Sequence, residues 1–193
     1  MDATGHGLMH SSSNRKDMRN QVKFVVEDRG KGKIALKTAD GRYVYIAGAG
    51  LWKYAVLPLG KSIPDSFEGD ILVPFAVESS LSGVGKTLGE DKELWYQREF
   101  VIPSKWRGKR ILLHFGAVDW KTEVWVNNIK VGEHTGGFTP FTFDITQALK
   151  NSENNLVVKV WDPTEKGTQP RGKQVSNPHG IWYTPVVRLA VQA

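Results

Sequence analysis

Paired carboxylates are the first groups to consider, because two acids held together can carry out general acid–base chemistry. Such pairs must lie about 5–10 Å apart on one face of the site. The densest acidic cluster, Glu90-Asp91-Lys92-Glu93, lies in a turn-like segment and is typical of a solvated loop. Asp119 and Glu123 are four positions apart and could share one strand face, although a structural use is the commoner one. The sequence therefore predicts no catalytic residue.

The residue types argue against a metal site and against thiol chemistry. The chain has no cysteine, which excludes disulfides, thiolate metal sites and cysteine nucleophiles. Only two of the five histidines lie near each other, and they belong to a segment rich in Ser and Gly with no helix to hold them. We expect no metal site. The histidines are His6, His10, His114, His134 and His179.

A glycine-rich segment, Gly83-Val84-Gly85-Lys86-Thr87, suggests a phosphate-binding loop. Such a loop needs a glycine five places before the Gly-Lys pair and a helix after it. This chain has Ser80 at that place, and residues 88–91 do not begin a helix. A serine-hydrolase elbow needs a glycine two places before the serine, which Ser82 lacks. Neither a nucleotide site nor a cofactor is predicted.

Aromatic and polar side chains carry the remaining chemistry. Sugars present hydroxyls to planar polar groups and CH-rich faces to aromatic rings. Among the seven tryptophans, Trp125 alternates with two valines and is expected in the core, and Trp95 and Trp161 are core candidates too. Trp120 and Trp182 lie beside loop residues. These two are therefore the candidates for exposed sugar platforms.

Short strands must position these residues, because helical periodicity is nearly absent from about residue 52 onward. Asn127-Asn128 is typical of a tight hairpin turn, and a short helical turn is expected over residues 144–150, capped by Asp144 or Thr146. This pattern predicts an all-β antiparallel sandwich or jelly roll. Its strands are expected at 94–102, 110–115, 122–126, 129–131, 138–143, 156–161 and 186–191.

Residues 1–50 differ from the rest of the chain in composition and in predicted local structure. A polar run in residues 1–21 indicates a flexible leader, and residues 22–50 predict a short β-meander added to the main sheet, with strands at 22–27, 34–38 and 42–46. Residues 34–44 resemble one repeat of a fascin-like β-trefoil, with no second copy. We expect the main domain to occupy residues 51–193.

Composition narrows the class of protein. The 193 residues are 40% hydrophobic and 10% aromatic, which excludes disorder for most of the chain. Most of the +6 charge lies in residues 1–50, so the main body is close to neutral. A near-neutral body argues against nucleic-acid binding. Neither a membrane span nor a signal peptide is recognised, which leaves a cytoplasmic and a secreted or periplasmic location both open.

The main body also carries motifs in a fixed order. They are Trp95–Phe100 as WYQREF, 106–120, 124–141, 143–146, 154–158, Trp161-Asp162-Pro163, 170–174 and 180–185. These motifs resemble the N-terminal sugar-binding domain of glycoside hydrolase family 2, the family of β-galactosidases, β-glucuronidases and β-mannosidases. The resemblance covers about residues 52–191 and implies a galactose-binding-like jelly roll. In that family the acid/base and nucleophile glutamates belong to a separate barrel, which needs about 250 residues of its own.

The resemblance also implies a site. The segment 161–183 is rich in Pro, Gly and polar residues, and long structured loops tend to be functional. In family β-galactosidases an Asp at the place of Asp162 reaches toward the galactosyl site, so this loop would border a saccharide cleft. Alternatively, the loop only docks the jelly roll on the barrel. The sugar-binding residues expected are Asp162, Arg171, Lys173, Gln174, Trp120 and Trp182.

The sequence thus predicts a non-catalytic module that binds carbohydrate weakly, without metal or cofactor. Two alternatives remain. The chain could be an interaction scaffold that self-associates, for which a homo-oligomer is expected, or it could be a fragment or subunit of an active β-galactosidase-like hydrolase.

Overall fold

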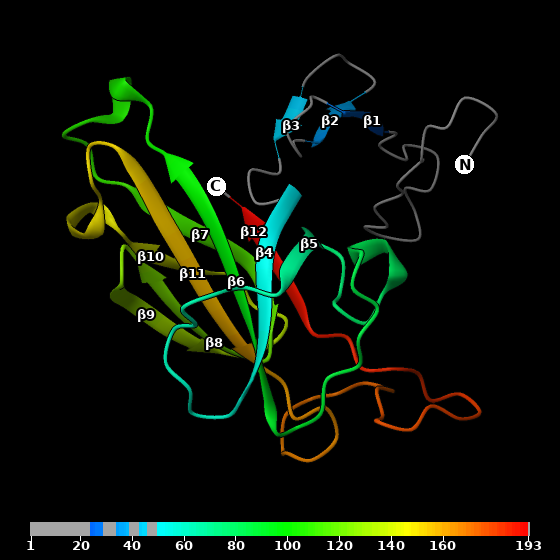
Figure 1. Ribbon diagram of the computed structural model, residues 1–193. Coiled ribbons are helices and arrows are strands. Elements are labelled where there is room, and N and C mark those ends of the chain that lie inside the picture. The colour runs from blue at the N-terminus through cyan, green and yellow to red at the C-terminus, as the bar shows by residue number, and fades with distance from the viewer. Residues whose placement is uncertain (1–23, 29–33, 39–42, 46–49, 193) are drawn as a thin grey trace.

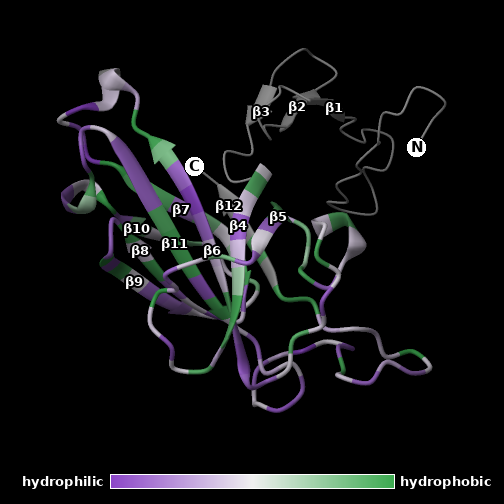
Figure 2. Ribbon diagram, in the orientation of Figure 1, coloured by the Kyte–Doolittle hydropathy of each residue, from purple (hydrophilic) through white to green (hydrophobic). Residues whose placement is uncertain are grey.

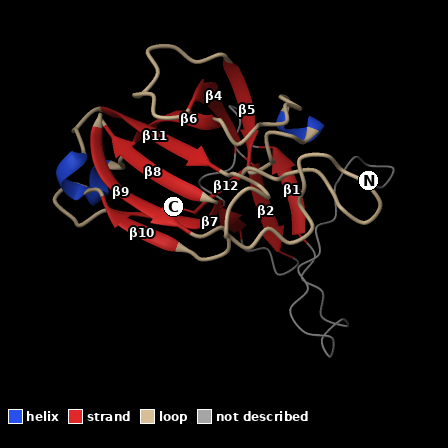
Figure 3. Cartoon of the chain, turned by 90° about the horizontal axis from the view of Figure 1, so that it is seen from below, coloured by secondary structure: helices blue, strands red, loops and turns tan. Residues whose placement is uncertain are grey.

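A computed structural model describes residues 24–28, 34–38, 43–45 and 50–192. In those ranges the regular secondary structure is almost entirely antiparallel β strand (Figures 1 and 3), which confirms the predicted fold class. Three single-turn 3₁₀ helices are η1 (Ser80–Ser82), η2 (Ser104–Trp106) and η3 (Thr146–Ala148). The strands are β1 (Phe24–Asp28), β2 (Ile34–Thr38), β3 (Tyr43–Tyr45), β4 (Gly50–Pro58), β5 (Gly69–Val73), β6 (Lys92–Val101), β7 (Leu112–Asp119), β8 (Lys121–Val126), β9 (Ile129–Thr135), β10 (Phe141–Asp144), β11 (Glu153–Trp161) and β12 (Arg188–Gln192).

Two sheets form the sandwich. One has the strand order β5-β4-β6-β11-β8-β9, and the other has the order β10-β7-β12. Strands β1, β2 and β3 pair antiparallel near the expected positions of the meander, but they form a sheet of their own, so the expectation that they add to the main sheet is wrong. The leader and the fascin-like turn residues lie outside the described ranges.

The core lies between the two sheets, because alternate residues of each strand point inward. On β11, for example, Leu156, Val158 and Val160 are buried in the main cluster together with Phe115 of β7 and Leu189 of β12. Figure 2 colours the strands by hydropathy, and both β6 and β11 carry polar as well as apolar stretches. The inward faces therefore join strands that are distant in sequence.

The sequence predicts two local features near their observed positions, the β8–β9 turn and the short helical turn η3. Asn127 and Asn128 have φ angles of 51° and 67°, as a tight β8–β9 hairpin requires. The side-chain Nδ2 of Asn127 also donates to the Ala148 carbonyl and to Asn154 Oδ1, both at 2.8 Å. Asp144 Oδ1 accepts the Thr146 amide at 3.0 Å just before η3, while the N-cap position itself is Ile145.

Several expectations about strands and burial are wrong. The predicted strand 138–143 begins only at Phe141, since the preceding Pro140 has no amide to donate. Glu93, expected in a solvated loop, is a buried member of β6 that pairs with Lys159 at 3.2 Å. Trp125 is half-buried on the outer face of the six-stranded sheet, because its valine neighbours fill the inward positions.

Candidate functional site

The loop between β11 and β12, residues 162–187, forms one end of the sandwich (Figure 1). Its two limbs are joined by hydrogen bonds from the Val175 amide to the Tyr183 carbonyl and from the Tyr183 amide to the Lys173 carbonyl, each 2.9 Å long. The side chain of Gln174 is buried, and its Oε1 accepts the Val186 amide at 2.5 Å. This hydrogen bond holds residue 174 against the end of the loop. The loop is therefore built as a structured element.

Asp162 is the first residue after β11 and is only 6% exposed. Its Oδ1 accepts the Thr164 amide at 2.7 Å, which fixes the first turn of the loop. Burial raises the pKa of the Asp162 carboxyl, and this hydrogen bond acts in the opposite direction. Asp162 thus combines a structural role in the loop with a position at the end of the sandwich.

Glu78 lies close enough to Asp162 for the two charges to interact. Burial raises the pKa of Glu78 to about 7, and the negative charges of Asp162 and Asp119 add to that effect. Glu78 Oε2 accepts the Val187 amide at 3.1 Å, while Oε1 is buried without a hydrogen-bond partner among the described residues. Glu78 is therefore within electrostatic reach of carboxylates from two other parts of the chain.

Asp119 and Glu123 do not share a strand face, because Asp119 ends β7 whereas Glu123 lies in β8. Glu123 lies on the outer face of β8 and pairs with Lys130 at 2.6 Å and Lys159 at 2.5 Å. Asp119 ends β7 and instead acts on Glu78. The sequence around Glu78 offers no motif that would have identified it, so sequence reasoning missed this residue.

The cationic part of the loop lies on an aromatic ring. The Arg171 guanidinium lies over the Trp182 ring, 5.3 Å from its centroid, and pairs with Glu165 at 3.2 Å. Trp182 is half-buried and Lys173 is exposed. Trp120 is half-buried at the corner between β7 and β8, next to Asp119 in the chain. The structure thus brings Arg171 to Trp182, and it places Asp162 and Asp119 each within electrostatic reach of Glu78.

The carboxylates do not form a metal centre by their geometry. Within the described ranges, no group of three or more His, Asp or Glu side chains is arranged to hold an ion. Likewise, none of the helices that the structure describes has the length and apolarity to cross a bilayer.

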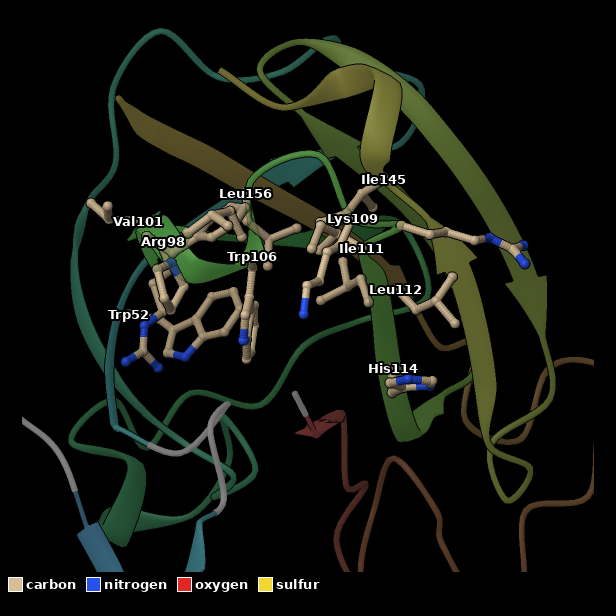
Figure 4. Close-up of a pocket in the computed structure, with 15 residues that line it drawn as sticks. Trp52, Arg98, Val101, Trp106, Lys109, Ile111, Leu112, His114, Ile145 and Leu156 are labelled. Atoms are coloured by element: carbon tan, nitrogen blue, oxygen red, sulfur yellow. The ribbon is translucent and has the colours of Figure 1, made fainter. Parts of the chain in front are cut away.

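The 104–106 turn, η2, lies at the opposite end of the sandwich from the 162–187 loop (Figure 1). A second hollow lies beside it (Figure 4). It is a groove of about 640 Å³ between the end of β6 and the start of β7. Most of the residues that line it are apolar. Three cationic residues, Arg98, Lys109 and Arg110, also line it. Arg98 lies over the Trp52 ring at 5.6 Å, and burial lowers the pKa of its guanidinium. No residue of the predicted sugar site lines this groove.

Comparisons with known proteins agree with the motifs. Residues 74–183 match the family model described as glycosyl hydrolases family 2, sugar binding domain. A β-galactosidase of Thermoanaerobacter pseudethanolicus is 41% identical over 83 residues, which is 42% of this chain and 11% of that protein. A β-glucuronidase of Paenibacillus borealis is 28% identical over 132 residues, which is 65% of this chain and 22% of that protein. The chain therefore spans less than a quarter of the length of these relatives.

Solved structures give similar matches. A β-glucuronidase from Ruminococcus gnavus, in complex with a C6-substituted uronic isofagomine, has 27% sequence identity and a TM-score of 0.49 over 60% of this chain and 21% of that one. A Lactobacillus rhamnosus β-glucuronidase has 29% identity and a TM-score of 0.49 over 60% of this chain and 20% of that one. The family model covers more than half of the chain and includes most of the 162–187 loop. The chain therefore belongs to the sugar-binding domain family of family 2 glycosyl hydrolases.

Proposed function

We propose that this chain is a saccharide-binding module that holds sugar at the 162–187 loop and does not cleave glycosidic bonds by itself. The observation that carries the proposal is the loop itself. It places a carboxylate, Asp162, in the same structured element as the Arg171–Trp182 pair, within the span that matches the sugar-binding domain. A carboxylate, a cation and an aromatic ring are the groups that recognise sugar hydroxyls and ring faces.

Each residue would have a distinct part in this binding. Asp162 would accept hydrogen bonds from sugar hydroxyls, and Arg171 and Lys173 would donate to sugar oxygens. Trp182 or Trp120 would offer an apolar surface, while Gln174 would keep the inner limb in place through Val186. Because the loop lies at an open end of the sandwich, most of a ligand would stay in water. We therefore expect a dissociation constant near the millimolar range, or about −4 kcal/mol.

Catalysis by this chain alone is not expected. Family 2 hydrolysis resembles other glycosidase reactions in needing one carboxyl as acid and a second as nucleophile or base. Here Glu78 Oε2 is bound to the Val187 amide and Asp162 Oδ1 is bound to the Thr164 amide. Both carboxylates therefore fasten the loop.

A second candidate function is a part of an active β-galactosidase- or β-glucuronidase-like enzyme. It is favoured by the partial coverage of the large relatives, which are 11% and 22% spanned. In that setting the same loop would border the cleft of a catalytic domain.

The test is a titration with galactose and glucuronic acid, followed by NMR on the wild type and on two lysine variants. Lys173 and Lys166 are both exposed residues of the loop. We expect shifts in residues 162–187 and a several-fold loss of affinity in Lys173→Ala but not in Lys166→Ala. If sugars move no resonance of the loop, the site is wrong. If an aryl glycoside is turned over at a rate proportional to this protein and lost in Glu78→Gln, the non-catalytic assignment is wrong.

A further inference from the structure

The outer face of the six-stranded sheet carries polar and aromatic residues that the loop site does not use. Trp95 of β6 lies directly opposite Lys159 of β11, and Val157 of β11 lies opposite both Gln97 of β6 and Trp125 of β8. Since residues two apart share a face of a strand, all five point away from the core. This face is built from three adjacent central strands.

Two stacked indoles form the floor. The rings of Trp95 and Trp125 lie 5.5 Å apart between centroids at an interplanar angle of 26°. They pack with Val157, which lies on the strand between them. Lys159 is 5.5 Å from the Trp95 centroid and 5.9 Å from the Trp125 centroid. The floor is therefore a fixed aromatic surface.

The charge of Lys159 is already balanced. Its ammonium pairs with Glu93 at 3.2 Å and with Glu123 at 2.5 Å. An anion placed here would have to compete with two carboxylates for that ammonium. The charges at this floor thus favour a neutral ligand.

A groove of about 540 Å³ runs over this floor, with residues 61–65 as one wall. Ligand pockets commonly have volumes of about 300–1,000 Å³. The amide side chains of Gln97, Asn128 and Asn155 line it together with Trp125. Amides both donate and accept, as hydroxyl-rich ligands require.

Two polar atoms of the groove residues are buried without a hydrogen-bond partner among the described residues. One is Nε1 of Trp95, whose side chain is 1% exposed, and the other is Oδ1 of Asn155. Buried polar atoms are nearly always paired in folded proteins. The groove thus offers one unused donor and one unused acceptor near an aromatic surface. A sugar hydroxyl can accept a hydrogen bond from the indole N–H, and a neighbouring hydroxyl can donate one to the amide oxygen.

We infer that this groove is a second saccharide site, separate from the 162–187 loop, and that its ligand is a neutral oligosaccharide. Trp125 supplies the apolar surface, Trp95 Nε1 donates to one hydroxyl, and Asn155 Oδ1 accepts from its neighbour. Gln97 and Asn128 bind further hydroxyls along the groove. This site goes beyond the proposed function and does not depend on the loop.

The test uses NMR titration with neutral oligosaccharides, namely cellotetraose, xylotetraose, mannotetraose and a β-linked galactotriose. The indole N–H signals of Trp95 and Trp125 report on the groove directly, and the backbone amides of 162–187 report on the loop. We expect at least one of these sugars to shift both indole signals with saturation in the millimolar range. The variants Gln97→Ala and Asn155→Ala should each weaken this binding at least fivefold.

Matched controls separate the groove from general effects. Gln147→Ala and Asn151→Ala change exposed residues of the same types outside the groove, and Lys173→Ala changes the loop. All three should bind like the wild type when read at the indole signals, even if the loop binds no sugar at all. The inference is overturned if none of the four sugars shifts the indole signals up to tens of millimolar. It is also overturned if Gln97→Ala and Asn155→Ala bind as well as their controls, or if only glucuronic acid binds there.

Discussion

At the scale of single residues, Glu78 is an acid whose ionisation the fold moves into the neutral pH range. Its pKa rises from an ordinary 4.5 to about 7, chiefly through burial. Between these two values the folded chain keeps a proton that the unfolded chain has lost. The contribution of Glu78 to the free energy of unfolding is therefore full below about pH 4.5, falls as pH rises, and levels off above about pH 7.

Glu78→Gln should remove this dependence. The amide keeps an acceptor for the Val187 N–H but carries no charge, so the variant should gain stability relative to wild type as pH rises from 4.5 to 7. The difference should reach about 2–3 kcal/mol, since one pKa unit corresponds to about 1.4 kcal/mol. Urea unfolding at several pH values measures it. Glu99→Gln, at an exposed position, is the control, and parallel curves for Glu78→Gln and wild type would contradict the prediction.

The two stacked tryptophans should differ in their contribution to stability. Trp95 is 1% exposed, whereas Trp125 is half-buried. Trp95→Ala should therefore lower the free energy of unfolding by about 3–5 kcal/mol, and Trp125→Ala by clearly less. Urea denaturation of both variants decides this. Equal losses would mean that Trp125 is as tightly packed as Trp95.

At the scale of elements, Gly132 lets β9 pass close to β10. A Cβ at Gly132 would overlap the ring of Phe143, which packs against the main core. Gly132→Ala should therefore destabilise the chain by about 1–3 kcal/mol, as overpacking does. Gly69→Ala is a matched control in β5, because its Cβ would meet Tyr54 at an ordinary 3.5 Å. Thermal unfolding that ranks the two variants equally would contradict this reading of the β9–β10 contact.

At the scale of the whole molecule, apolar side chains remain exposed around the groove beside η2. Val101 is 64%, Trp106 42% and Leu112 39% exposed. Contiguous apolar surface of this kind marks interaction sites. We therefore expect the chain to form a homo-oligomer, most simply a dimer. Light scattering should show this, and Trp106→Ser should shift the population toward monomer. A monomer at all concentrations from micromolar to millimolar would refute the expectation.

The sequence by itself determined most of the strands from β6 onward, the β8–β9 turn and the family, but not β4 or β5. Alternation along β8 is a local pattern, and so are the Asn127-Asn128 turn and the hydrogen bond of Asp144 to the Thr146 amide. Each depends on residues a few positions apart, whose backbone preferences do not need the rest of the chain. The motif order likewise indicated a family 2 sugar-binding domain, which the family match over residues 74–183 confirms.

Only the tertiary structure decided which residues meet. Glu78, Asp119 and Asp162 come from segments some forty positions apart, and the packing of β7, β11 and their loops brings Asp119 and Asp162 within electrostatic reach of Glu78. The same limit explains Trp125. The alternation of side chains along a strand shows which residues share one face of that strand. It does not show which of the two faces the second sheet covers. In this molecule the valines of β8 face the second sheet, and Trp125 is left on the outer surface beside Trp95.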